Sequence, residues 1–142
     1  MTPPPPPPSN RGSDLDATAA SRVATMSDRI HFDYNVADIK SDDRGRLDTK
    51  AQLMKQFGAL HIRITGHCDE RGSDEYNIAL GMRRANAAKD YLVQAGIDAS
   101  RIEVASLGRE QPIDPGHDES AWSKNRRDEF DIIAGAPSLR AP

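Results

Sequence analysis

Apolar and polar residues alternate along residues 60–65, where Leu60, Ile62 and Ile64 are separated by polar side chains. A repeat of two residues predicts a strand with one buried face, because successive side chains of a strand point to opposite sides. Shorter patterns of the same kind predict three more strands, at residues 30–34, 102–106 and 130–133.

Two segments carry the longer spacing of an amphipathic helix. The first is predicted to start at Ser41, a suitable N-cap that two aspartates follow, and to stop at Gly58. The second is predicted to be capped by Ser73 and closed by Gly96. Its predicted buried stripe consists of Ile78, Met82, Ala85, Ala88 and Leu92.

The predicted order of elements is β-α-β-α-β-β, which indicates an α+β sandwich with two main helices packed on one face of a mixed sheet. We assign residues 26–135 to this domain. Residues 1–25 include six consecutive prolines and little apolar mass, so they are interpreted as a flexible tether or spacer. A recognition tail or an inert leader is the alternative for this segment. Residues 136–142 are expected to be a frayed end.

The composition excludes several classes of function. The net charge is −3, with 19 basic residues spread among 22 acidic ones, which argues against a nucleic-acid partner. The chain has no apolar run long enough to span a membrane and no recognisable signal peptide. Its single cysteine cannot form an internal disulfide.

The polar loop between Gly66 and Gly72 is the strongest candidate for a site, because a loop between a strand and a helix can present side chains from a rigid scaffold. Within the following helix, Asn77, Leu80 and Arg84 are three and four residues apart and therefore share one face. We expect Asp69 of the loop and Arg84 to converge over one pocket. The alternative is a structural ion pair that only ties the loop to the helix.

Metal and nucleophilic catalysis are both disfavoured. His67, Cys68 and Asp69 are consecutive, but neighbouring side chains on an extended segment point in opposite directions, and no paired metal-binding motif occurs. His67 is also poorly placed to act as a base for a Cys68 nucleophile. We therefore predict no catalytic residue, no metal and no cofactor.

Residues 66–72, with the sequence Gly-His-Cys-Asp-Glu-Arg-Gly, closely resemble the OmpA-like peptidoglycan-binding domain, whose pattern here is Gly-His-x-Asp-x-x-Gly. The resemblance spans residues 27–135, and the Asp-Glu-Arg-Gly sequence is most similar to the peptidoglycan-associated lipoprotein branch of that family. Gly81 and Cys68 depart from the family pattern. Further matches are Asn77, Leu80, Arg84, Ala85, Tyr91 and Leu92 in the helix, and residues 32–35, 106–112 and 125–127.

This resemblance implies non-enzymatic binding of diaminopimelate in the stem peptides of peptidoglycan. In the family, the residue matching Asp69 accepts hydrogen bonds from the ligand ammonium, and the one matching Arg84 binds its carboxylate as a fork. The residues matching Phe32 and Asp33 lie beside the same pocket and lend it backbone and shape. Asn77 and Leu80 are secondary contacts by the same resemblance.

Other residues of the motifs have less certain roles. His67 is expected either to contact the ligand or to anchor the loop as a structural histidine. One of the paired arginines Arg126 and Arg127 is expected to pack against an acidic residue of the loop and stabilise the domain.

The resemblance also implies partners and a location. The partners are peptidoglycan, the β-propeller protein of the periplasmic Tol system, and the outer membrane through a lipid anchor that this chain lacks. The location is the periplasmic side of the outer membrane of a Gram-negative bacterium. A wall-binding tail of another envelope protein is the alternative within the family, and a metal- or cysteine-dependent wall hydrolase is the alternative from another class.

Overall fold

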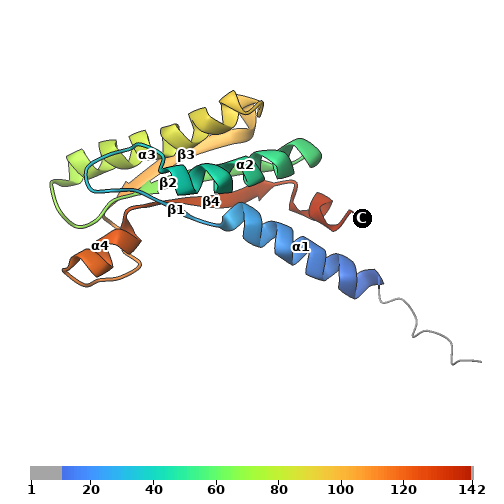
Figure 1. Cartoon of the computed structure of the whole chain (residues 1–142), viewed down its shortest axis with the longest axis horizontal. Helices are drawn as coiled ribbons and strands as arrows, with labels where there is room; N and C mark the ends of the chain where they lie inside the picture. The colour runs from blue at the N-terminus through green and yellow to red at the C-terminus, as the bar shows by residue number, and fades with distance from the viewer. Residues whose placement is uncertain (1–10, 142) are drawn as a thin grey trace, which may run out of the picture.

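A four-stranded mixed sheet lies at the centre of the part of the chain that the structure describes, residues 11–141 in this computed structural model (Figure 1). Its strands are β1 (Ile30–His31), β2 (His61–His67), β3 (Ile102–Gly108) and β4 (Arg127–Ala134). The helices are α1 (Arg11–Ser27), α2 (Ser41–Gln56), α3 (Asp74–Gln94) and α4 (Glu119–Asn125), with short 3₁₀ turns at Ala99–Arg101 and Ala136–Arg140.

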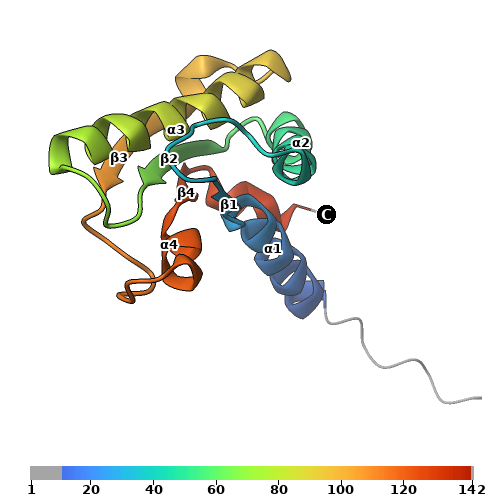
Figure 2. The same cartoon turned by 60° about the vertical axis from the view of Figure 1, so that its left-hand side comes forward.

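The strand order is β1-β4-β2-β3, with β2 and β3 parallel and the other pairs antiparallel. The predicted α+β class and mixed sheet are therefore confirmed. Helix α3 connects the parallel pair and packs on both strands, while α4 lies near the end of the sheet where β4 begins (Figures 1 and 2). Among the described residues, no helix has the length and apolar character needed to cross a membrane.

Two glycines allow α3 to lie close to the sheet. A Cβ atom on Gly66 of β2 would collide with the backbone carbonyl of Gly81, and one on Gly81 of α3 would collide with the side chain of Ser106. Glycine is the residue that permits such a close backbone approach. Gly66 lies within β2 rather than in the loop, because the strand continues two residues beyond the predicted 60–65.

The hydrophobic core lies between the sheet and helices α1, α2 and α3, since buried side chains of all these elements form one cluster. Its fully buried large residues include Met26, Ile30, Phe32, Leu47, Met54, Leu60, Ile62, Ile64, Leu92 and Phe130.

The first strand is shorter than the prediction of residues 30–34. Strand β1 ends at His31, and a turn follows in which Asn35 has a φ angle of 62°. The backbone carbonyls of Asp33 and Val36 accept hydrogen bonds from Arg84 instead of from a neighbouring strand. The prediction failed here because the alternating pattern assigns this backbone to the sheet, whereas its carbonyls bond to the buried side chain of Arg84.

The predicted buried stripe of the second helix is correct only in its C-terminal half. Ala85, Ala88 and Leu92 are buried, but Ile78 is 37% exposed and Met82 is partly exposed. In the N-terminal half of α3 the buried side chains are instead Asn77, Leu80 and Arg84. This half faces the polar loop and not the apolar core, so hydrophobic periodicity does not identify its buried face. The N-cap predicted for this helix is confirmed, since the Ser73 hydroxyl accepts a hydrogen bond from the Tyr76 amide at 3.1 Å. The cap predicted at Ser41 is wrong, because Ser41 is already the first residue of α2 and its N-cap is Lys40, which makes no side-chain capping bond.

The prediction of a flexible tether over residues 1–25 is wrong from Arg11 onward, and residues 1–10 lie outside the described residues. Residues 11–27 form α1, which packs against β4 and the C-terminal turn. Its inward positions are Leu15, Ala19, Arg22 and Met26, at helical spacing, and Met26 is fully buried. The polar residues between these positions obscured the pattern in the sequence.

Lys50 of α2 holds the end of α1 in place. Its ammonium is fully buried and donates hydrogen bonds to the backbone carbonyls of Thr25 at 2.9 Å and Met26 at 3.0 Å, and also to that of Asp28. A cation at this end of a helix satisfies carbonyls that have no partner within the helix. The ammonium also lies 4.3 Å from the centre of the Phe130 ring, which fixes the position of α1 relative to the sheet.

The predicted frayed end is also wrong. Residues Ala136–Arg140 form a turn, and the Leu139 side chain is fully buried. Arg22 of α1 donates hydrogen bonds to the carbonyls of Leu139 at 2.6 Å and Ala141 at 2.7 Å. The two ends of the described chain therefore stabilise each other, which Figure 1 shows as the C-terminal turn beside α1.

We expect Met26→Ala to lower the free energy of unfolding by about 2–4 kcal/mol, because the change removes a fully buried side chain. Urea unfolding followed by circular dichroism measures the loss. The control is Val23→Ala on the same helix, where Val23 is 39% exposed and the cost should stay within about 0.5 kcal/mol. Equal stability of the Met26→Ala protein and the wild type would mean that α1 is not docked on the domain.

Candidate functional site

Asp69 and Arg84 line the same small hollow, at the point where the loop after β2 meets the first half of α3. The hollow has a volume of about 10 Å³, which is close to the space of one water molecule. The convergence inferred from spacing is thus present in the structure. The lining residues are Tyr34, Asn35, Cys68, Asp69, Arg71, Tyr76, Asn77, Leu80 and Arg84.

Arg84 is fully buried and bonded to backbone. Its guanidinium donates hydrogen bonds to the carbonyls of Val36 at 2.9 Å, His67 at 3.0 Å and Asp33 at 3.0 Å. These bonds tie α3 to the turn after β1 and to the end of β2. A guanidinium has five N–H donors, so these three bonds leave two of its donors unused.

Asp69 is 4% exposed, and its carboxylate is held by two arginines. Arg71 donates to it from Nη2 at 2.8 Å, from Nε at 3.2 Å and from its backbone amide at 3.0 Å, and Arg126 donates at 3.4 Å. Burial alone would raise the pKa of Asp69, but the hydrogen bonds from Arg71 outweigh it and hold the pKa below its usual range. Asp69 is therefore an anion in the folded protein.

Arg126 fulfils the structural role expected for one of the paired arginines. It donates to the Phe32 carbonyl at 2.8 Å and to Glu119 at 2.6 Å, in addition to its bond to Asp69. Its side chain is only 5% exposed. It fixes β4, α4 and the loop relative to one another.

Arg71 was not identified as a site residue from the sequence. Its guanidinium carbon lies 3.8 Å from the centre of the Tyr34 ring and 4.0 Å from that of Trp122. The Trp122 indole in turn donates a hydrogen bond to Glu70 at 3.0 Å. No periodic pattern could have found this stack, because the three residues come from separate loops and helices.

The remaining predicted residues occupy distinct places around the hollow. Phe32 belongs to the core, with its ring centre 5.1 Å from the Arg84 guanidinium. Asp33 contributes its backbone carbonyl to Arg84, while its exposed side chain pairs with Lys40. Asn77 donates to the Arg71 carbonyl at 2.9 Å and so braces the loop, and Leu80 supplies an apolar wall.

The structure does not bring the His67 ring into the hollow. Only its backbone carbonyl reaches Arg84, and its imidazole, 1% exposed, lies 3.5 Å from the Glu129 carboxylate. The physical reason is strand alternation, since Gly66 faces α3 and His67 points to the opposite side of β2. Burial, helped by the nearby charge of Arg127, lowers the pKa of His67 to about 4.

Asp128 of β4 is a second buried carboxyl group near this site. It is fully buried, and neither of its oxygens has a hydrogen-bond partner. Burial raises its pKa well above the usual range, against the opposing effect of the Arg84 charge. Burial thus favours the protonated, neutral form of Asp128, which the sequence did not reveal.

The arrangement of Cys68 is unsuited to nucleophilic catalysis. Its buried thiol contacts the Asn77 carbonyl at 3.3 Å, and burial raises its pKa, whereas a reactive cysteine needs a lowered one. Within residues 11–141, no group of three or more His, Cys, Asp or Glu side chains is placed to hold a metal ion.

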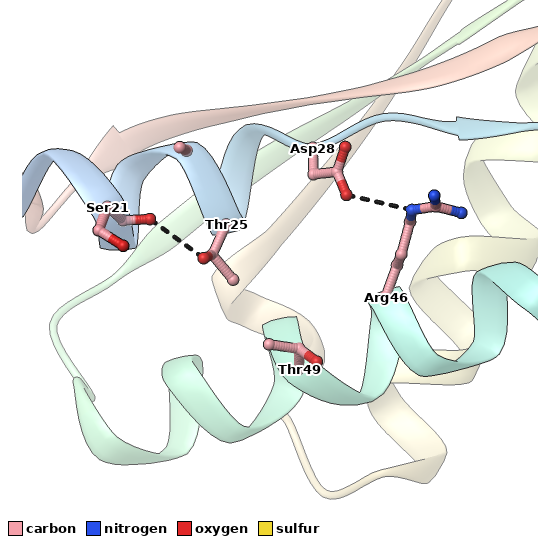
Figure 3. A pocket seen from close by; sticks show the side chains of 6 residues that line it. Ser21, Thr25, Asp28, Arg46 and Thr49 are labelled. Carbon is pink, nitrogen blue, oxygen red and sulfur yellow. Dashed lines mark hydrogen bonds and ion pairs between the residues drawn. The ribbon is translucent and has the colours of Figure 1, made fainter.

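A larger hollow of about 420 Å³ lies between α1 and α2 and contains none of the predicted residues (Figure 3). It is lined mainly by small polar side chains, and its two charged residues, Asp28 and Arg46, are paired with each other at 3.1 Å. The smaller hollow combines an anion with a cation that retains free donors, so we regard it as the candidate site.

The comparisons with known proteins agree with this placement. The model of the OmpA family matches residues 31–126, from β1 to the end of α4, and this range contains every residue of the hollow. The chain belongs to the OmpA family.

Curated relatives are about two fifths identical to this chain over the aligned residues. A peptidoglycan-associated lipoprotein of Rhizobium meliloti is 42% identical over 127 residues, which cover 89% of this chain and 69% of that protein. One from Pseudomonas aeruginosa is 41% identical over 119 residues, covering 84% of this chain and 68% of that protein.

Solved structures of the OmpA-like type support the fold. The peptidoglycan-associated lipoprotein of Burkholderia pseudomallei matches with a TM-score of 0.72 and 38% identity, over 73% of this chain and 88% of that chain. The C-terminal domain of Helicobacter pylori MotB also matches with a TM-score of 0.72, over 79% of this chain and 88% of that one. At 23% identity it shows a shared fold alone.

We expect Arg84→Lys to lower the free energy of unfolding by about 2–3 kcal/mol, because one ammonium cannot satisfy all three carbonyls from the same position. Chemical denaturation measures the loss. Arg83→Lys, on the exposed neighbouring residue, is the control and should change stability by less than about 0.5 kcal/mol. A Lys variant as stable as the wild type would show that these three bonds do not stabilise the fold.

His67 should make the protein less stable in mild acid. The folded state has a pKa of about 4 here, below the unfolded value of 6.5, so between these values only the unfolded chain binds the proton. Stability should therefore fall as the pH drops from 6.5 to 4, by at most about 3 kcal/mol from this group. Urea unfolding at several pH values should give a shallower loss for His67→Gln, and identical slopes would contradict the assignment.

Proposed function

We propose that this chain binds peptidoglycan non-covalently through the diaminopimelate residue of a stem peptide, and so links the outer membrane to the cell wall. The observation that carries the proposal is the presence of a buried anion, Asp69, and a buried cation, Arg84, on one hollow in an OmpA-family domain. The printed names of the relatives add support, because they describe peptidoglycan-associated lipoproteins.

The chemistry of the two groups suits this ligand. Diaminopimelate carries an ammonium and a carboxylate on one carbon atom. The Asp69 carboxylate can accept hydrogen bonds from the ammonium, and the two N–H donors that Arg84 has not used can bind the carboxylate. Both contacts would form in a largely buried environment, where charged hydrogen bonds are stronger than in water.

The other residues have supporting roles in this proposal. Asp33 and His67 position Arg84 through their carbonyls, and Asn77 braces the loop that carries Asp69. Leu80 forms the apolar wall, and the Phe32 ring packs near Arg84. The His67 side chain has no part in binding.

The proposal also covers partners and location. We place the domain on the periplasmic side of the outer membrane of a Gram-negative bacterium, held there by a lipid anchor in a longer precursor. The β-propeller protein of the Tol system is the proposed protein partner. The word lipoprotein in the relatives' names supports the anchor.

We expect Asp69→Asn to reduce retention of the protein on purified peptidoglycan sacculi about tenfold or more, because an amide cannot replace the charged acceptor. The control is Asp74→Asn, which removes an equal charge from an exposed side chain in the first turn of α3. Thermal unfolding checks that both variants fold.

Retention of Asp69→Asn equal to that of the wild type would refute the proposed site. The muropeptides released from treated sacculi should remain unchanged, because a binding protein leaves its ligand intact. New cleavage products would instead favour the wall hydrolase.

A further inference from the structure

The Asp69 carboxylate already has a cationic partner within its own loop. Arg71 forms two side-chain hydrogen bonds to it, one to each oxygen, and a third from its backbone amide. The guanidinium thus occupies the position next to Asp69 that the ammonium of a ligand would need. The small volume of the hollow, about 10 Å³, leaves no room for both groups.

Of the two arginines on Asp69, Arg71 is the one that can leave. Arg126 is 5% exposed and is also held by the Phe32 carbonyl and Glu119. The Arg71 side chain is 31% exposed, and its guanidinium is otherwise held only by stacking on Tyr34 and Trp122. Such stacking contributes about 0.5–1 kcal/mol on an exposed ring such as Tyr34 and at most about 2 kcal/mol on the half-buried ring of Trp122, so it can be broken at a moderate cost.

We propose that Arg71 is a built-in competitor for the ligand cation, which closes the site until a ligand with its own cation replaces it at Asp69. This inference rests on the proposed function, because it concerns the same hollow. In the exchange Arg71 moves out to solvent, and the incoming ammonium takes over its hydrogen bonds. Asp69 is paired both before and after binding.

The exchange makes Arg71 a specificity-determining residue. A ligand without a cation could enter only by leaving the buried Asp69 carboxylate with fewer partners, which is costly. Binding of a cationic ligand is weakened too, because the measured affinity is reduced by the small fraction of molecules whose site is open. Arg71 therefore exchanges some affinity for selectivity.

The test is calorimetry with a soluble tripeptide stem that ends in diaminopimelate, on the wild type and on Arg71→Met. Methionine keeps an unbranched apolar side chain between the two rings but removes the competing charge. We expect Arg71→Met to bind the tripeptide about five-fold or more tightly than the wild type does. The same tripeptide with its free side-chain amine acetylated should gain less than two-fold, because it brings no cation to Asp69.

Arg109→Met is the matched control. Arg109 bonds Asp74 and the Glu70 carbonyl at the edge of the same loop, so its removal changes the local charge equally without touching Asp69. Its affinity for the tripeptide should stay within two-fold of the wild type. An equal gain in affinity in both variants would mean that removing any positive charge near the site strengthens binding. That result would overturn the competitor role of Arg71.

A second readout follows the displacement itself. In nitrogen-15 spectra of the arginine side chains, the Nε–H signal of Arg71 should shift when the tripeptide binds to the wild type, and that of Arg109 should not. Weaker binding by a folded Arg71→Met protein would make Arg71 a ligand contact and refute the inference.

The two proposals fail in different ways. If the wild type binds sacculi and Asp69→Asn does not, the proposed function stands, and an unchanged affinity of Arg71→Met then refutes the competitor alone. If no variant binds either the tripeptide or sacculi, the proposed function and the competitor fall together.

Discussion

The buried guanidinium of Arg84 is the constraint that holds together the turn after β1, the end of β2 and helix α3. It comes from α3 and bonds to carbonyls of the turn after β1 and of the last residue of β2. Because all three bonds come from one fully buried guanidinium, the turn, the strand end and the helix must be arranged around one side chain. The same arrangement brings the Asp69 loop beside α3. The fold and the candidate site thus share a single residue, and neither can be altered there independently.

Much of the fold could be predicted from the sequence because local signals agree with the final structure. The alternation at Leu60, Ile62 and Ile64 marks a strand with one face in the core, and the Ser73 cap marks the start of a long helix. Residues 11–25 and 136–141 were predicted wrongly because their stability comes from contacts distant in sequence. Leu139 is buried beside α1, and Lys50 of α2 satisfies the end of α1, so composition alone could not reveal either segment.

The candidate site was predictable in part. The spacing of Asn77, Leu80 and Arg84 places them on one helix face, and the resemblance to a known domain pointed to Asp69. The stack of Arg71 between Tyr34 and Trp122 was missed, because it joins residues that only the tertiary fold brings together. The raised pKa of Asp128 was also missed, since it depends on complete burial without a hydrogen-bond partner.

Helix α1 has a further consequence for how the molecule behaves among copies of itself. Strand β1 pairs only with Arg127 and Asp128, so within the described chain no strand lies beside the rest of β4 on that side. Helix α1 packs there instead. Open strand edges of this kind can pair with an edge on another molecule and start aggregation. Helix α1 therefore covers an edge that a chain beginning at β1 would expose, and we expect such a shorter chain to aggregate more readily.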